Sequence, residues 1–126
     1  MFRIGYEQLS LEEQKVEATL RAQLEPIVEM MQIKGESECR NGMYGVVGTE
    51  DELCNFEKVR DFGQPELSDC GESAEFGAQA GRGCTSRTDY VRFSLIEGLR
   101  EKQRIGVNPY AFGFIGSTDN HMASPG

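Results

Sequence analysis

The sequence predicts an α/β fold within a single domain, residues 1–126. Two segments of helical periodicity are each followed by a short apolar run, and a helix that feeds a strand is the repeating unit of α/β folds. The two helix–strand units occupy residues 10–33 and 86–126, and a region of different composition, residues 34–85, separates them. Since each strand follows a helix, we expect the two strands to be parallel.

The first unit carries signals for both of its elements. Ser10 followed by Glu13 fits a capping box, in which each side chain satisfies an unpaired amide at the start of a helix. Apolar residues four apart then form one stripe of an amphipathic helix, namely Val16, Leu20 and Leu24. Pro26 disfavours continuation of this helix. The run that follows, residues 27–33, is mostly apolar, so we expect a strand covered on both faces.

The central region, residues 34–85, is a long, acidic and glycine-rich loop region. It contains nine of the fifteen glycines, and its five cations and eleven anions give it a charge of 5 − 11 = −6. A connection of this length is typical either of a functional loop over an active site or of a disordered segment. All four cysteines fall in this region, and they allow either two disulfides or four reduced thiols: Cys39, Cys54, Cys70 and Cys84.

The second unit repeats the order of helix and strand. Ser86 and Asp89 loosely repeat the capping pattern, and Gly106 is suited to the end of a helix. The apolar stripe between them consists of Val91, Leu95 and Leu99. Residues 111–117 then predict a second buried strand, whose glycines suggest close approach by another backbone or by a ligand.

The overall charge and composition exclude several classes of protein. The net charge of 13 − 21 = −8 argues against a general binder of nucleic acid or anionic membranes, which needs a basic face. No apolar run approaches the ~18 residues of a membrane span. No signal peptide is visible in residues 1–10. His121 is the single histidine, so no site within this chain can use two imidazoles.

The candidate chemistry is concentrated just after the second strand. Asp119 and His121 are two residues apart, so their side chains point the same way if the segment is extended. A carboxylate and an imidazole at the carboxyl end of a strand form half of a site for Zn²⁺, Mn²⁺ or Fe²⁺. The alternative is a solvated turn, which is the usual setting of an isolated Asp-x-His.

Several ordered motifs resemble those of the bacterial domain-of-unknown-function family 3604, a PHP-like (polymerase and histidinol phosphatase) family of metal-dependent hydrolases. The matching segments are residues 32–40, QIKGESECR; 51–57, DELCNFE; 84–87, CTSR; 90–92, YVR; and 106–121, GVNPYAFGFIGSTDNH, which trails into 123–126, ASPG. The resemblance is dense over residues 25–57 and 84–126, and the order of the motifs makes it more specific than any one of them.

The resemblance implies a distorted (β/α) barrel of PHP type with a centre of two or three metal ions, Zn, Mn or Fe, at its strand ends. It assigns Asp119 and His121 as metal ligands, and Lys34 and Glu38 as pocket residues that bind the substrate. For Lys34 the alternative is a simple turn after the strand. The substrate implied is a small anionic molecule, with no nucleic-acid or membrane partner.

The sequence also departs from the PHP pattern. PHP enzymes use an early His-x-His pair and further histidines, and this chain contains neither. We therefore expect a partial domain, the C-terminal part of a barrel whose remainder comes from missing sequence, in a periplasmic or cytoplasmic protein.

The function implied is metal-dependent hydrolysis of a phosphoester or similar ester bond by metal-activated water. The alternative is a non-catalytic truncated fragment or binding module that cannot load metal alone. Cys39 and Cys54 both belong to the matched motifs, so they are the expected disulfide pair if the protein is exported.

Overall fold

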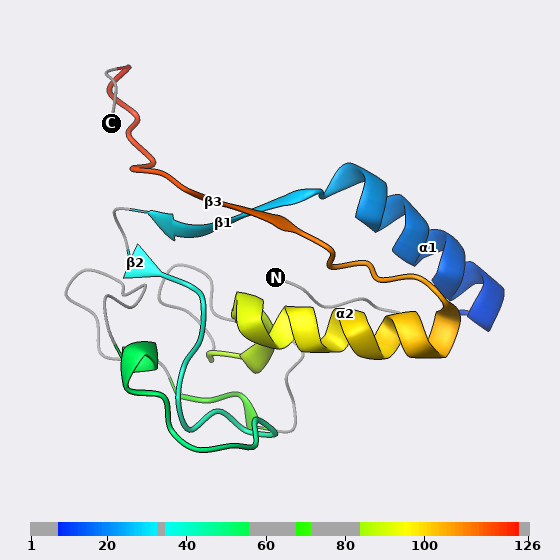
Figure 1. The fold of residues 1–126 in the computed structure, drawn as a ribbon, viewed down its shortest axis with the longest axis horizontal. Helices are drawn as coiled ribbons and strands as arrows, with labels where there is room; N and C mark the ends of the chain where they lie inside the picture. The colour runs from blue at the N-terminus through cyan, green and yellow to red at the C-terminus, as the bar shows by residue number, and fades with distance from the viewer. Residues whose placement is uncertain (1–7, 33–34, 56–67, 72–83, 124–126) are drawn as a thin grey trace.

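The computed structural model describes residues 8–32, 35–55, 68–71 and 84–123 (Figure 1). The helices are α1 (Leu11–Leu24) and α2 (Val91–Ile105), and the strands are β1 (Ile27–Gln32), β2 (Gly35–Glu36) and β3 (Gly113–Gly116). Two short 3-10 turns, Glu52–Asn55 and Arg87–Asp89, complete the elements. None of the helices in these ranges is long and apolar enough to cross a lipid bilayer.

The strands form one sheet in the order β2-β1-β3 (Figure 1). β1 and β3 are parallel, with Ile27 opposite Gly113, which confirms the pairing expected from the two helix–strand units. β2 is antiparallel to β1 and was not predicted, because two residues are too few for any periodicity. The sheet is mixed, because it contains one parallel and one antiparallel pair, and with the two helices it forms a small α/β structure. The larger barrel stays a prediction.

The helix ends follow their local sequence signals. Ser10 and Glu13 form the predicted capping box, and the hydrogen bonds from Ser10 lower the pKa of Glu13. Gly106 ends α2 with a φ of 83°, in the left-handed region that favours glycine. Ser86 and Asp89 also form a capping box, but it opens the 3-10 turn, and α2 begins two residues after that turn's last residue, Asp89.

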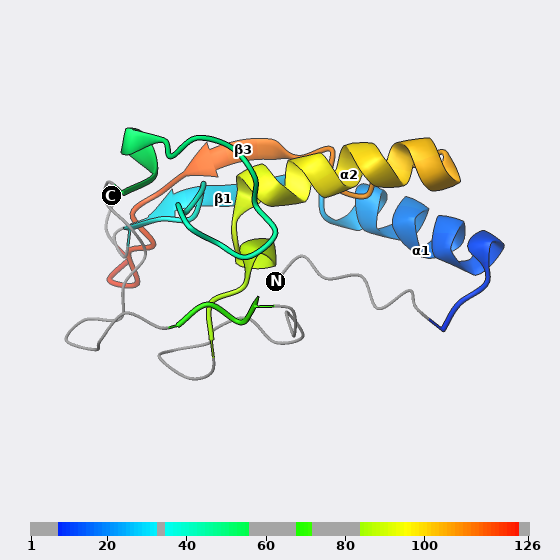
Figure 2. The same ribbon diagram turned by 90° about the horizontal axis from the view of Figure 1, so that it is seen from below.

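The core lies between α2 and a single face of the sheet. Val91 and Tyr110 are buried, and Val28 and Met30 of β1 pack against them. Ala18 of α1 packs against the end of α2 in a second, smaller cluster. Figure 2 shows α1 and α2 on the same side of the molecule, with the strands extending beyond them.

The expectation that both strands are buried is wrong for the described residues. Every residue of β3 is exposed, with Phe114 and Ile115 about half accessible, because β3 is an edge strand and α2 covers one face only. The stripe predicted on α1 also faces outward: Val16, Leu20 and Leu24 are exposed, and Ala18 and Gln14 are buried instead.

Two disulfides close loops in the central region. Cys39 bonds Cys54, which confirms the pair expected from the matched motifs, and Cys70 bonds Cys84. No cysteine is free. The two disulfides therefore constrain the described parts of this region covalently. A parallel β-bridge between Asp69 and Thr85 adds a further backbone contact.

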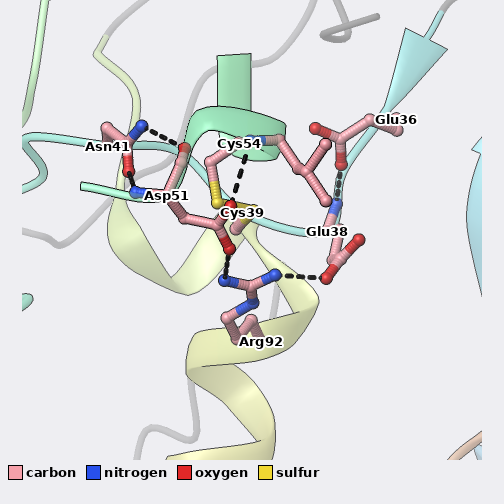
Figure 3. A network of polar contacts seen from close by, with 8 residues as sticks. Glu36, Glu38, Cys39, Asn41, Asp51, Cys54 and Arg92 are labelled. Atoms are coloured by element: carbon pink, nitrogen blue, oxygen red, sulfur yellow. Dashed lines mark hydrogen bonds and ion pairs between the residues drawn. A yellow bond between two sulfur atoms is a disulfide. The ribbon is translucent and has the colours of Figure 1, made fainter. Parts of the chain in front are cut away.

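The loop closed by Cys39 and Cys54 is fastened to the start of α2 (Figure 3). Arg92 donates to Glu38 at 2.5 Å and to Asp51 at 2.8 Å. Asn41 fixes Asp51 in place, because its amide nitrogen donates to the Asp51 carbonyl and its oxygen accepts from the Asp51 amide. Glu38, just before the loop, and Asp51, within it, thus share one arginine as their partner.

We predict that the exposed apolar surface makes the 126-residue chain marginally stable by itself. Thermal unfolding should be broad and should depend on protein concentration, because β3 is an edge strand whose four residues are all exposed. Circular dichroism at several concentrations, with sedimentation velocity, measures this. Ile115→Lys should reduce association, whereas Val47→Lys, at a fully exposed loop position, should not. A sharp, concentration-independent transition of a monomer would contradict the prediction.

We also predict that the Cys39–Cys54 disulfide contributes more stability than the ion pairs of Arg92. Replacing both cysteines by alanine should cost about 3 kcal/mol for a loop of this length, and Arg92→Met about 1 kcal/mol, because its partners are partly exposed. Urea unfolding gives both values. Arg100→Met, which removes an exposed pairing with Glu97 on the same helix, is the control. Equal losses in the two variants would refute the ranking.

Candidate functional site

Asp119 and His121 lie side by side after β3. The His121 Nε2 is 3.6 Å from the Asp119 Oδ1, and the imidazole is 79% exposed while the carboxylate is 27% exposed. The backbone between them is not extended as expected: Asp119 has a φ of 52°, and its amide donates to the Ser117 hydroxyl. Aspartate tolerates this left-handed conformation. A turn therefore brings together the two groups that the sequence placed on one side of an extended segment.

The spacing of the two groups suits a shared metal ion. With bonds of about 2.1 Å and tetrahedral angles, two ligand atoms of one ion are about 3.4 Å apart. The observed 3.6 Å is close to this separation. Within the ranges that the structure describes, no third potential ligand, such as a cysteine or a carboxylate, lies close enough to complete a metal-binding group with them. The pair is therefore half of a site, and a bound ion would need further ligands.

The position of the pair follows from the sheet. Gly116 lies opposite Met31, and the Ser117 amide donates to the Met31 carbonyl at 3.0 Å. The carboxyl ends of β1 and β3 therefore meet just before Asp119, at the edge where α/β enzymes collect functional residues. A Cβ at Gly116 would make only ordinary contacts with Met31, so the glycine is not required by close packing.

The two predicted pocket residues have different outcomes. Lys34 lies outside the described residues, although its neighbours Gln32 and Gly35 pair at the end of β1. Glu38 is engaged in the loop instead: its carboxylate accepts from Arg92, and its backbone amide donates to Glu36. The structure does not bring Glu38 into a group with Asp119 and His121.

Arg92 and Asp51 are central to the described structure, although no role was predicted for either residue from the sequence. Hydrogen bonds from Arg92 to Asp51, and then to Glu38, raise the pKa of the arginine. Arg92 does fall within a matched motif, but its partners are 41 and 54 positions away in the chain. Contacts so distant have no periodicity from which a single sequence could predict them.

Comparison with known proteins gives one match. The sequence model of a family described as "Protein of unknown function (DUF3604)" matches residues 1–126. Comparison with curated proteins found no match, and neither did comparison with solved structures. Since the family match spans the whole chain and agrees with the ordered motifs, the protein belongs to the DUF3604 family.

Proposed function

We propose that the protein contributes to a divalent-metal centre of a PHP-like hydrolase that cleaves a phosphoester or similar ester bond. The observation that carries the proposal is the 3.6 Å separation of Asp119 and His121 at the carboxyl end of a parallel strand. An exposed imidazole and a carboxylate are ligands that Zn²⁺, Mn²⁺ and Fe²⁺ accept. When bound, such an ion supplies an activated water and polarises the scissile group.

The roles of the residues follow from their charges. The carboxylate of Asp119 would balance part of the charge of a cation, and the neutral imidazole of His121 would donate a nitrogen lone pair. Lys34 would steady an anionic group of the substrate, since an ammonium does not ligate a cation. The substrate is then a small anionic molecule, and the net charge of −8 disfavours nucleic acid and membranes.

The architecture proposed is a distorted (β/α) barrel in which β1 and β3 are neighbouring strands. The support is the bare surface of β3 and the outward apolar stripe on α1, both of which further strands and helices would cover. The remainder of this barrel would supply the missing ligands, among them the histidines that the chain does not contain.

A binding module that cannot load metal is the second candidate. It is favoured by the finding that only two of the described residues form the candidate site. An upstream His-x-His pair in the same reading frame would favour the enzyme. Metal analysis of the full-length protein beside the 126-residue chain separates the two proposals, because the binding module holds no metal in either form.

In the full-length protein, Asp119→Asn and His121→Ala should each remove metal and activity together. Asparagine keeps the shape of aspartate but loses the charge, and no other imidazole in this chain can replace His121. Elemental analysis and far-ultraviolet circular dichroism test this, with the exposed carboxylate variant Glu12→Gln as control. Full metal occupancy in both site variants would end the ligand assignment.

Lys34→Ala should behave differently from the ligand variants. It should retain metal and raise KM at least tenfold, because the variant loses a charge that binds substrate and not the ion. Lys15→Ala, on the exposed surface of α1, is the matched control. An unchanged KM would favour the simple turn after the strand, and loss of metal would show that Lys34 supports the centre itself.

A further inference from the structure

A small pocket lies beside the start of α2, between this helix and the loop closed by Cys39 and Cys54. Its volume is about 60 Å³, far below the 300–1,000 Å³ of sites for drug-sized ligands. Its apolar lining includes Met43, Val46, Phe93 and Ile96, and its polar lining includes Arg87 and Tyr90. A space of this size accepts one compact group rather than a whole large molecule.

Arg87 lines this pocket as a half-buried side chain, and among the residues that the structure describes it has no ionic partner. Its guanidinium lies over the Phe93 ring, with the Cζ atom 4.9 Å from the ring centroid, and its Nη1 donates to the Tyr44 carbonyl at 3.3 Å. The guanidinium also occupies the space beside Gly45, because a Cβ added at this glycine would lie only 2.6 Å from Nη1. The Nε is buried and has no hydrogen-bond partner.

The nearby Arg92 differs from Arg87 in its ionic partners. Arg92 has two carboxylate partners, Glu38 and Asp51. In the portion of the chain that the structure describes, no carboxylate forms an ion pair with Arg87, whose positive charge is therefore balanced only by a ring and a carbonyl. The buried Nε has no hydrogen-bond acceptor in the described structure, so an oxyanion at the pocket could supply one and balance the charge.

Tyr90 adds a second polar group to the same lining. Burial raises the pKa of Tyr90, against an opposing effect of Arg40, so its hydroxyl is protonated at neutral pH. The lining thus places Arg87 beside mostly apolar side chains, and it also includes Arg40, which hydrogen-bonds to Tyr90, and Arg92. An oxyanion is the group that would pair with the guanidinium, and an apolar body would fill the rest.

We propose that this pocket, named here the Arg87 pocket, binds a small organic oxyanion carried on one compact apolar group. The carboxylate or phosphate oxygens pair with Arg87, and the apolar group packs against Phe93, Met43 and Ile96. The proposal is independent of the metal centre: the start of α2 and the segment that carries Asp119 and His121 are well separated in both views (Figures 1 and 2).

Titration of the protein with phenyl phosphate, in buffer that contains a metal chelator, tests the Arg87 pocket. Binding followed by nuclear magnetic resonance should saturate and should move the amide signals of the 39–46 loop and of the first turn of α2. Benzoate should bind at the same place, since it carries the same class of charge. Benzyl alcohol, which has a ring without a charge, and inorganic phosphate, which has a charge without a ring, should each bind at least tenfold more weakly.

Variants assign the binding to the pocket. Arg87→Met should weaken binding of phenyl phosphate at least tenfold, because a charge-assisted pairing is lost. Arg100→Met, in the neighbouring helix α2, is the matched control, and it should bind normally because Arg100 is exposed and pairs with Glu97. Ile96→Glu is the second variant. Ile96 is 46% exposed, so the change adds a repelling charge to the lining without removing a buried residue.

Several outcomes would overturn the proposal. One is the absence of saturable binding at about 10 mM phenyl phosphate, a limit that corresponds to very weak affinity. Another is binding that survives both Arg87→Met and Ile96→Glu. If benzyl alcohol bound as tightly as phenyl phosphate, the charge of the ligand would not matter and the pocket would be an apolar crevice only. If inorganic phosphate bound as tightly as phenyl phosphate, the apolar walls would not contribute to binding. If Arg87→Met fails to fold, the Ile96→Glu result decides.

Discussion

Helix α2 begins without a side-chain cap, and the segment that follows β2 satisfies its first amides instead. The backbone amides of Val91 and Arg92 donate to the carbonyls of Ser37 and Glu38 at 3.0 and 2.9 Å. Unpaired amides at a helix start otherwise need water or a capping side chain. These two hydrogen bonds between distant segments fix the position of the start of α2. Both the core around Val91 and the Arg87 pocket depend on that position.

The two sides of α2 therefore have different functions in the fold. One side supplies Val91 and Leu95 to the core against β1. The other carries Phe93, which supports the guanidinium of Arg87 and lines the pocket. The sheet itself receives only one layer of cover, and for this reason a strand as apolar as β3 remains exposed in the described structure.

Local signals were sufficient to predict much of the fold. The capping box at Ser10, the glycine at the end of α2 and the two apolar runs placed both helices and both long strands, because each depends on residues close in sequence. The face of α1 was predicted wrongly. Val16 and Leu20 satisfy the periodicity, yet the small Ala18 is the residue that fits against α2. The apolar periodicity of a helix predicts an apolar face, but it does not predict which other element packs against that face.

In the candidate site and the central region, too, contacts between residues near in sequence were predicted, and contacts between distant segments were not. The proximity of Asp119 and His121 follows from their separation of two residues, although a turn and not an extended backbone produces it. The pairing of Cys39 with Cys54 was accessible through motif positions, whereas the pairing of Cys70 with Cys84 and the contacts of Arg92 were not. These contacts depend on how the central region folds back on α2, and no single segment encodes that path.

The closed loop between Cys39 and Cys54 also has a consequence for the order in which the chain folds. Both cysteines precede α2 in the sequence, and their separation is 15 residues, whereas the contact of Glu38 with Arg92 spans 54. Shorter loops cost less entropy to close, so the loop can form before the helix docks. Closing this loop brings Glu38 and Asp51 near each other, so we expect their contacts with Arg92 to form after the loop has closed.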